Sequence, residues 1–483
     1  MRAVSLLAVT IAICWSPGAE AAPPAAPART LAELDAAFAA SARDLARRAT
    51  AAGAAQLATL IDQWDPPRPP GRQMAFAIPP RLEKPATIAG AAEESIWSDF
   101  VAARRARAAG LFEHAVFAAG AHDRQPTRDE LAEPPEGPRP PLPQRSCAAL
   151  ELVQRTLRDD PEHERARLAG GWVKRGDAWV SAAAVRHLDR GEVFDPEFGW
   201  LPAARLERYR AGERYDAGRW VPAAEDEAKH RDLKHAREFH GDHWEIVTAV
   251  PLEQAGRLSA QLEQTRVVWR QVFGAFAWEP ADLERLLAGR VRPVARTPHA
   301  AILCRDRDHY VSELARLEPR ADGSDGLYWL PTKTIWFHAG QDGSGAAGPD
   351  PVTVHHEGTH QLFAESRPEL DRVRHLAGER CGFWAIEAAG CYMESIEPAS
   401  FGWTVGGREA GRVPDAQARL TEGFFVPLDE LCGMGREAFQ TVDRLPDLYA
   451  QVAGLADFFM NGAEGSLREP FVEYLVRVYS GTA

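Results

Sequence analysis

The sequence is poor in cysteine, and its few cysteines are not grouped. Six occur among 483 residues, and no two of them form a C-x-x-C pair. A zinc ribbon built on paired cysteines is therefore excluded. Five cysteines remain if the N-terminal segment described below is removed. In an exported protein, these allow one or two disulfides and a leftover thiol.

Positive charge is also in deficit. Lys and Arg number 56 against 69 Asp and Glu, which gives a net charge of −13 and a pI near 5.7. A dedicated nucleic-acid binder carries a basic domain, and a protein held on anionic lipids carries a polybasic segment. The composition argues against both classes, and we expect no nucleic-acid partner.

Long apolar runs are missing except at the N-terminus. There Arg2 precedes an apolar stretch over residues 3–15, and residues 19–21 read A-E-A, the form of a signal-peptidase site. The stretch is too short to remain as a membrane-spanning helix. It predicts a signal peptide over residues 1–21 and export to the periplasm or the extracellular space. No transmembrane segment is expected after cleavage.

The length predicts several domains of about 100–200 residues each. Apolar residues recur at helical spacing over much of 22–121, which predicts a helical N-terminal region. It includes a helical hairpin before Trp64 and a long helix near residues 91–119. Prolines and charges are concentrated in 122–146, which is typical of a linker or an extended arm.

An internal repeat occupies much of residues 147–239. The pentapeptides W-V-S-A-A, W-L-P-A-A and W-V-P-A-A begin at Trp179, Trp200 and Trp220. Their even spacing predicts small stacked units of strand, turn and short helix, with each Trp anchoring a local core. Exposed Trp side chains would instead form a stripe that binds carbohydrate or peptide. The N-terminal half is thus a candidate for contact with a protein or the cell wall.

Residues 240–483 have a different pattern, of strands followed by helices. The predicted elements form a small antiparallel sheet and then helices to the C-terminus, an α+β arrangement. Strands are expected at 244–250, 300–304, 327–330 and 334–337, and an amphipathic helix at 252–273.

A candidate metal motif follows this sheet. His356, Glu357 and His360 form H-E-x-x-H, and Asp350-Pro351 upstream supplies a helix cap and a first-turn proline. Residues four apart share a helix face, so both imidazoles can reach one Zn²⁺. Glu357 then stands where it can act on water at the metal. The alternative is an ordinary helix in which the two histidines form hydrogen bonds and bind no metal.

Glu387 is the predicted third ligand. It lies 27 residues after His360, a gap that accommodates a loop and part of a second helix. A catalytic zinc takes three protein ligands and keeps one open position, and two histidines with one glutamate form a known class. Ala388, Ala389 and Gly390 are small enough to let the two helices approach closely. The sequence therefore predicts one Zn²⁺ per chain.

These motifs resemble the gluzincin zinc metallopeptidases, in particular the peptidase MA-like family of exported bacterial proteins. The similarity covers roughly residues 240–483 and rests on H-E-x-T-H-Q-L-F from His356 and on the helix with Trp384, Glu387, Tyr392 and Glu394. The resemblance implies zinc at the three predicted ligands, with Glu357 as the general base. Ala388 departs from the usual glycine and Gly390 from the usual alanine, which bears on substrate fit more than on metal binding.

The expected reaction is hydrolysis of peptide bonds in a peptide or protein substrate by zinc-activated water, with Glu357 moving the proton. Glu394 is a candidate for holding a ligand imidazole in place without binding the metal itself. The strand at 334–337 either binds an extended peptide by β-addition or is an ordinary sheet strand. Candidates for stabilising the oxyanion, each with a structural alternative, are Tyr392, His355, Tyr449 and Arg468.

Two other functions remain open at this point. One is an inactive or metal-stabilised binding scaffold that uses the Trp repeats and the helical arm. The other is a zinc hydrolase that acts on a non-peptide amide or ester. Zinc content separates a metal-free scaffold from the rest, and peptide cleavage separates the two enzymes.

Overall fold

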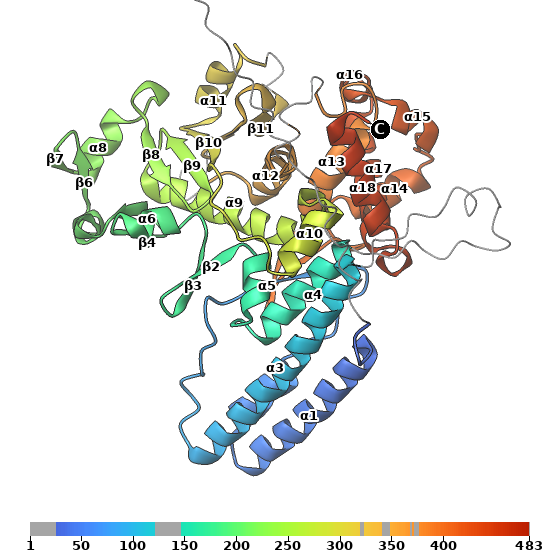
Figure 1. The fold of residues 1–483 in the computed structure, drawn as a ribbon. Helices are drawn as coiled ribbons and strands as arrows, with labels where there is room; N and C mark the ends of the chain where they lie inside the picture. The colour runs from blue at the N-terminus through green and yellow to red at the C-terminus, as the bar shows by residue number, and fades with distance from the viewer. Residues whose placement is uncertain are drawn as a thin grey trace, which may run out of the picture.

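The computed structural model describes residues 26–120, 146–318, 323–340, 348–367, 370 and 376–482. The predicted signal peptide and nearly all of the predicted linker lie outside the described residues. Within the described part, no helix combines the length and apolar character needed to cross a membrane. Helices are combined with small sheets (Figure 1), as expected for the α+β class.

The first described part is helical, as predicted. Thr30 caps α1 (Leu31–Ala51): its hydroxyl accepts a hydrogen bond from Glu33 N, and the Glu33 carboxylate accepts one from Thr30 N. This capping box satisfies two N–H groups that the helix leaves open. After α2 (Ala55–Asp62), the long helix α3 (Ala91–Gly120) packs along α1. The helices bury their own apolar cluster, which includes Phe38, Leu45, Trp97 and Phe100.

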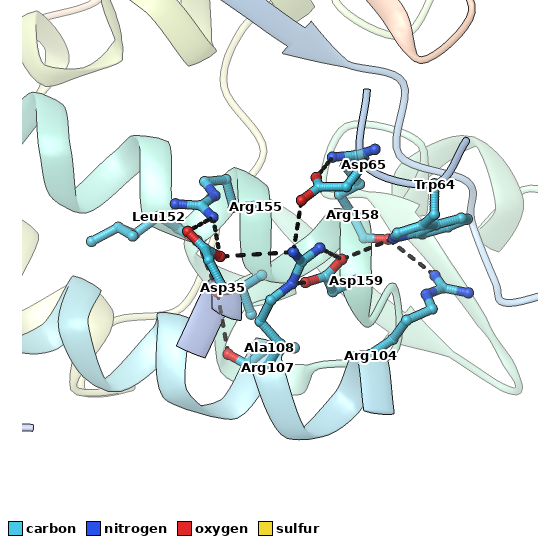
Figure 2. A network of polar contacts seen from close by, with 11 residues as sticks. Asp35, Trp64, Asp65, Arg104, Arg107, Ala108, Leu152, Arg155, Arg158 and Asp159 are labelled. Atoms are coloured by element: carbon cyan, nitrogen blue, oxygen red, sulfur yellow. Dashed lines mark hydrogen bonds and ion pairs between the residues drawn. The ribbon is translucent and has the colours of Figure 1, made fainter. Parts of the chain in front are cut away.

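Buried ion pairs join α3 to α4 (Ser146–Asp159). Arg107 on α3 donates from Nε and Nη2 to the two carboxylate oxygens of Asp159, at 2.6 and 2.8 Å. Arg107 also donates to Asp65, and the Trp64 indole donates to Asp159 (Figure 2). A paired guanidinium and carboxylate fix direction as well as distance. The network therefore sets how α3 and α4 lie against each other.

The Trp repeats form three hairpins, each with its Trp on the second strand. Trp179 and Trp200 are buried, and their indole N–H groups donate to Glu162 and Asp242. Trp220 is half-buried. The prediction of core anchors is confirmed for the first two. The elements are α5 (Glu164–Ala169), β2 (Trp172–Arg175), β3 (Ala178–Ser181), α6 (Val185–Asp189), β4 (Glu192–Asp195), β5 (Gly199–Pro202), η1 (Ala203–Arg205), α7 (Leu206–Arg210), β6 (Glu213–Asp216), β7 (Arg219–Pro222) and α8 (Ala223–Lys229).

A five-stranded sheet follows, in the order β11-β12-β10-β9-β8. It is mixed, so the prediction of an antiparallel sheet was wrong. The central strands β9, β10 and β12 are parallel, and only the outer strands β8 and β11 are antiparallel to their neighbours. The strands are β8 (Arg237–His240), β9 (Trp244–Thr248), β10 (His299–Cys304), β11 (Gly326–Trp329) and β12 (Thr334–His338).

The parallel pairs arise from the helices between the strands, because parallel neighbours need a crossover connection. The elements between β9 and β10 are α9 (Leu252–Val272), η3 (Gly274–Ala277) and α10 (Pro280–Leu287). Between β10 and β12 the chain passes through α11 (Arg307–Leu314) and β11, with η5 (Leu330–Thr332) closing the turn. Another short element, η2 (Leu233–His235), precedes β8.

The C-terminal part is mostly helical, as predicted. Figure 1 shows α12 between the sheet and the later helices, and α12 contacts both β11 and α13. No disulfide joins the cysteines of the described residues. The helices are α12 (Pro351–Glu365), α13 (Phe383–Met393), α14 (Val413–Thr421), α15 (Leu428–Gly433), α16 (Arg436–Gln440), α17 (Leu445–Asn461), η7 (Ala463–Gly465) and α18 (Arg468–Ser480).

A small sheet joins distant parts of the chain. β1 (Gln73–Phe76) pairs with β14 (Gly402–Val405), which in turn pairs with β13 (Glu397–Ala399), both antiparallel. The Gln73 amide also donates to the Met460 carbonyl, 387 residues away in the sequence. The main hydrophobic core accordingly contains residues from β1 as well as from α18. The N-terminal region is thus built into the structure that surrounds α13.

Candidate metal centre

The helix that carries the H-E-x-x-H motif, α12, begins at the cap and proline that the sequence predicts. The Asp350 carboxylate accepts a hydrogen bond from Thr353 N, and Pro351 occupies the first turn of α12. Pro351 lacks the N–H that a helix leaves unbonded at this position, and the carboxylate satisfies another one. On the side facing α9, a Cβ atom added to Gly358 would lie 3.4 Å from Cδ2 of Leu262, so α9 packs closely here. The face that carries the two motif histidines packs against α13.

His356, His360 and Glu387 converge between α12 and α13. The Nε2 atoms of the two histidines are 3.0 Å apart, and Oε2 of Glu387 lies 3.2 Å from Nε2 of His356 and 3.7 Å from Nε2 of His360. Their side chains are between 6% and 15% exposed. Tetrahedral zinc with bonds of about 2.0–2.1 Å holds its ligand atoms about 3.3–3.4 Å apart. The three donors thus fit the predicted ion in chemistry and in spacing.

The charge state of Glu387 suits a metal ligand. Burial raises the pKa of this carboxyl, but the neighbouring His360 and His356 more than offset burial and hold the pKa well below its usual range. An ionised carboxylate and two imidazoles form the donor set that zinc prefers in catalytic sites.

Gly390 sets the close approach of the two helices. A Cβ atom built on this glycine would lie 2.8 Å from Cε1 of His356, closer than such atoms pack. Ala388 and Ala389 beside it are fully buried. The small residues after Glu387 therefore do what the sequence predicted, and the critical one is Gly390.

Glu394 orients the first histidine from behind. Its Oε1 lies 2.8 Å from Nδ1 of His356, which leaves Nε2 of that ring directed at the cluster. Arg412 donates from Nε to Oε2 of Glu394 at 2.6 Å. Burial raises the pKa of Glu394, but His356 and then Arg412 hold it below its ordinary value. The predicted contact between Glu394 and a ligand imidazole is therefore present in the structure.

Glu357 lies beside the cluster but outside it. Its Oε2 accepts a hydrogen bond from Tyr328 N at 2.9 Å, so the backbone of β11 positions the carboxylate. β11 is an edge strand of the five-stranded sheet, whereas β12 is paired on both sides. The strand at 334–337 therefore has no free edge for β-addition, and the edge next to Glu357 is that of β11.

No family model, curated protein or solved structure matches the chain. The likeness to gluzincins therefore rests on the residues quoted above, and the site is interpreted from its own geometry.

Tyr449, on α17, is the candidate oxyanion stabiliser that faces the cluster. Its ring centroid is 6.5 Å from that of His356. Burial, followed by the charge of Glu387, raises the pKa of its hydroxyl above the usual value. The hydroxyl therefore stays protonated and can donate a hydrogen bond near the ligands.

The other three candidates point elsewhere. Nδ1 of His355 is 2.8 Å from the Thr265 hydroxyl on α9. The Tyr392 hydroxyl donates to Asn461, and Arg468 pairs with Glu151 on α4. All three side chains are buried in helix contacts, so their structural interpretation holds. Their positions in the sequence do not show which face of the helix packs against which neighbour.

Two residues of the site, Cys391 and Arg412, were not predicted, whereas Glu394 was. Cys391 and Glu394 both offer donor atoms within 4.8 Å of a His356 nitrogen. Glu387, Cys391 and Glu394 are spaced by four and three residues, so their common helix face was a usable signal. Arg412 comes from the start of α14, and nothing in its sequence context points to the site.

A second group of donor atoms occurs in the third Trp hairpin and the helix α8 that follows it. Asp216, Asp226 and His230 lie within 4.8 Å of one another. Arg237 forms ion pairs with both aspartates, and Lys229 donates to Asp216. These two cations already balance the carboxylates, so the group is explained as a structural ion cluster.

Proposed function

We propose that this protein is an exported zinc-dependent peptidase of the gluzincin type. The observation that carries the proposal is the convergence of His356, His360 and Glu387 on one point, with Glu357 alongside and outside the donor set. An ordinary pair of buried histidines does not require a third donor at matching distance or a separate carboxylate next to them.

When bound, zinc supplies a Lewis acid that polarises a carbonyl and acidifies water near neutral pH. His356, His360 and Glu387 would hold it. Glu357 then accepts the proton of the attacking water and delivers it to the leaving amine. The Tyr449 hydroxyl donates a hydrogen bond to the developing oxyanion.

The edge of β11 supports a peptide substrate. An extended chain that pairs with this edge satisfies the backbone groups that an edge strand leaves open. Tyr328 of β11 already donates its N–H to Glu357, so a peptide paired there lies next to the proposed base. A peptide bond is thus a better fit to this surface than a small ester or amide.

The first test is metal analysis of the purified mature chain, residues 22–483. We expect about one zinc per chain in the wild type and a loss of zinc in both His356→Ala and Glu387→Ala. His235→Ala is the control, because His235 is exposed and lies away from the cluster. Absence of zinc from the wild type, even after incubation with it, would overturn the proposal. Zinc retained in Glu387→Ala would show that another carboxylate is the third ligand.

We expect Gly390→Ala to weaken zinc binding. The added Cβ would displace the His356 ring or push α13 away from α12, and either change moves a ligand. A loss of about 10–100-fold in affinity is expected, as for removal of an outer-shell partner. Competition with a chromophoric chelator measures it. In Gly433→Ala the new Cβ meets nothing within 4 Å, so this control keeps its affinity. Unchanged affinity in Gly390→Ala would contradict the close approach of the helices.

A further inference from the structure

Three arginine side chains gather beside α9. Arg266 and Arg270 lie four residues apart on this helix and so share a face. Arg296, from the segment between α10 and β10, is close enough for its charge to act on both. Its Nη1 donates to the Ser366 carbonyl at 2.6 Å, which anchors it at the end of α12.

Arg266 and Arg270 have no hydrogen-bond or ion-pair partner within the described residues. Glu263 and Asp242 act on Arg266 only from a distance, and no carboxylate has a comparable effect on Arg270. Arg214, a buried arginine of the Trp-repeat region, pairs in contrast with Glu253. Partial burial of a cation without a partner is unfavourable, because removing a charge from water is costly unless the charge is paired.

The backbone at the start of β2 is shaped around Arg270. A Cβ on Gly171 would lie 2.7 Å from its Nη1 atom, and the φ of 89° at this residue favours glycine. The guanidinium therefore lies directly against main chain. Both arginines are only partly buried, so a small molecule from solvent can reach them.

The positive charges of Arg266 and Arg296 repel the charge of Arg270. Burial, followed by the charges of Arg266 and Arg296, lowers the pKa of the Arg270 guanidinium to about 9. The pKa of Arg266 is also lowered, mainly by burial. A bound anion would remove this mutual repulsion.

We propose that Arg266, Arg270 and Arg296 form a binding site for an oxyanion of the phosphate class, either free phosphate or a phosphomonoester. Planar guanidinium groups match the oxygens of phosphate in pairs, and three of them suit a dianion better than a single carboxylate. The site does not depend on the proposed peptidase activity, since it uses none of the residues of the metal centre.

The test is thermal unfolding in sodium phosphate and in sodium chloride at equal pH and ionic strength. We expect phosphate to raise the Tm by roughly 1–3 °C over chloride, because a ligand that binds only the folded state stabilises it. sn-Glycerol 3-phosphate, as a second arm, distinguishes a phosphomonoester site from one that fits only the free ion. Acetate, with one charge, is expected to give no rise.

Variants locate the effect. Arg270→Gln and Arg266→Gln are expected to lose the phosphate shift, and in chloride Arg270→Gln is expected to be at least as stable as the wild type because a repelled charge is removed. A purely structural arginine would give the opposite result in chloride. Arg257→Gln, at an exposed position of the same helix, is expected to keep the shift. No phosphate shift in the wild type, or a shift that persists in both Arg270→Gln and Arg266→Gln, would overturn the proposal.

Discussion

Glu357→Gln is expected to lower the rate of peptide hydrolysis by about 10²–10⁴-fold while zinc stays bound. Glutamine keeps the size of the side chain and still accepts the hydrogen bond from Tyr328 N, so the β11 contact is retained. It cannot take a proton from water. Because the side chain lies outside the donor set, the three ligands are unchanged.

The measurement is cleavage of a quenched fluorescent peptide library, with zinc determined on the same preparations. Glu437→Gln is the matched control, because this carboxylate is exposed on α16. Full activity in Glu357→Gln would show that another group moves the proton. Loss of both activity and zinc would show that Glu357 supports the ligands rather than the reaction.

Asp159→Ala is expected to destabilise the contact between α3 and α4 by about 3–5 kcal/mol. The Arg107 and Asp159 side chains are only 3% and 1% exposed, so the substitution leaves a buried guanidinium without its main partner. Because Asp65 still pairs with Arg107, we expect a loss of stability near the lower end of this range. The Trp64 indole also loses its acceptor.

Hydrogen exchange of the α3 and α4 amides under native conditions measures this effect, because it reports local opening free energies. Asp44→Ala, which removes only the exposed pair with Arg47, is expected to cost less than about 1 kcal/mol. The double variant Arg107→Met with Asp159→Leu is expected to recover most of the loss, since it removes both charges. Equal protection in Asp159→Ala and the wild type would mean that the network does not hold these helices.

The sequence was a good guide wherever a structure depends on neighbours along the chain. Asp350 and Pro351 fixed the start of α12, and the four-residue spacing placed His356 and His360 on one face. Alternating and helical patterns also located most strands and helices to within a few residues. Strand direction depends instead on the path between strands. The crossovers that make β9, β10 and β12 parallel could not be predicted from alternation alone.

Contacts between distant segments account for what was missed at the site. Glu387 could be chosen because a third zinc donor was required and the spacing allowed it. No comparable requirement pointed to Arg412. Tyr392 and Tyr449 were equal candidates in the sequence, and the packing of α17 against α13 separates them. Tyr392 is directed at Asn461, while Tyr449 approaches the ligands.

The pairing of β1 with β14 limits when the native molecule can form during synthesis. Arg72, just before β1, binds Glu397 at the start of β13, 325 residues further along the chain. At about 5–20 residues per second, a ribosome needs on the order of tens of seconds to make that interval. The helices of the N-terminal end can fold early, whereas β1 can pair only after β14 has been synthesised. Assembly around α13 is thus a late event, possible only after the chain has been made as far as β14.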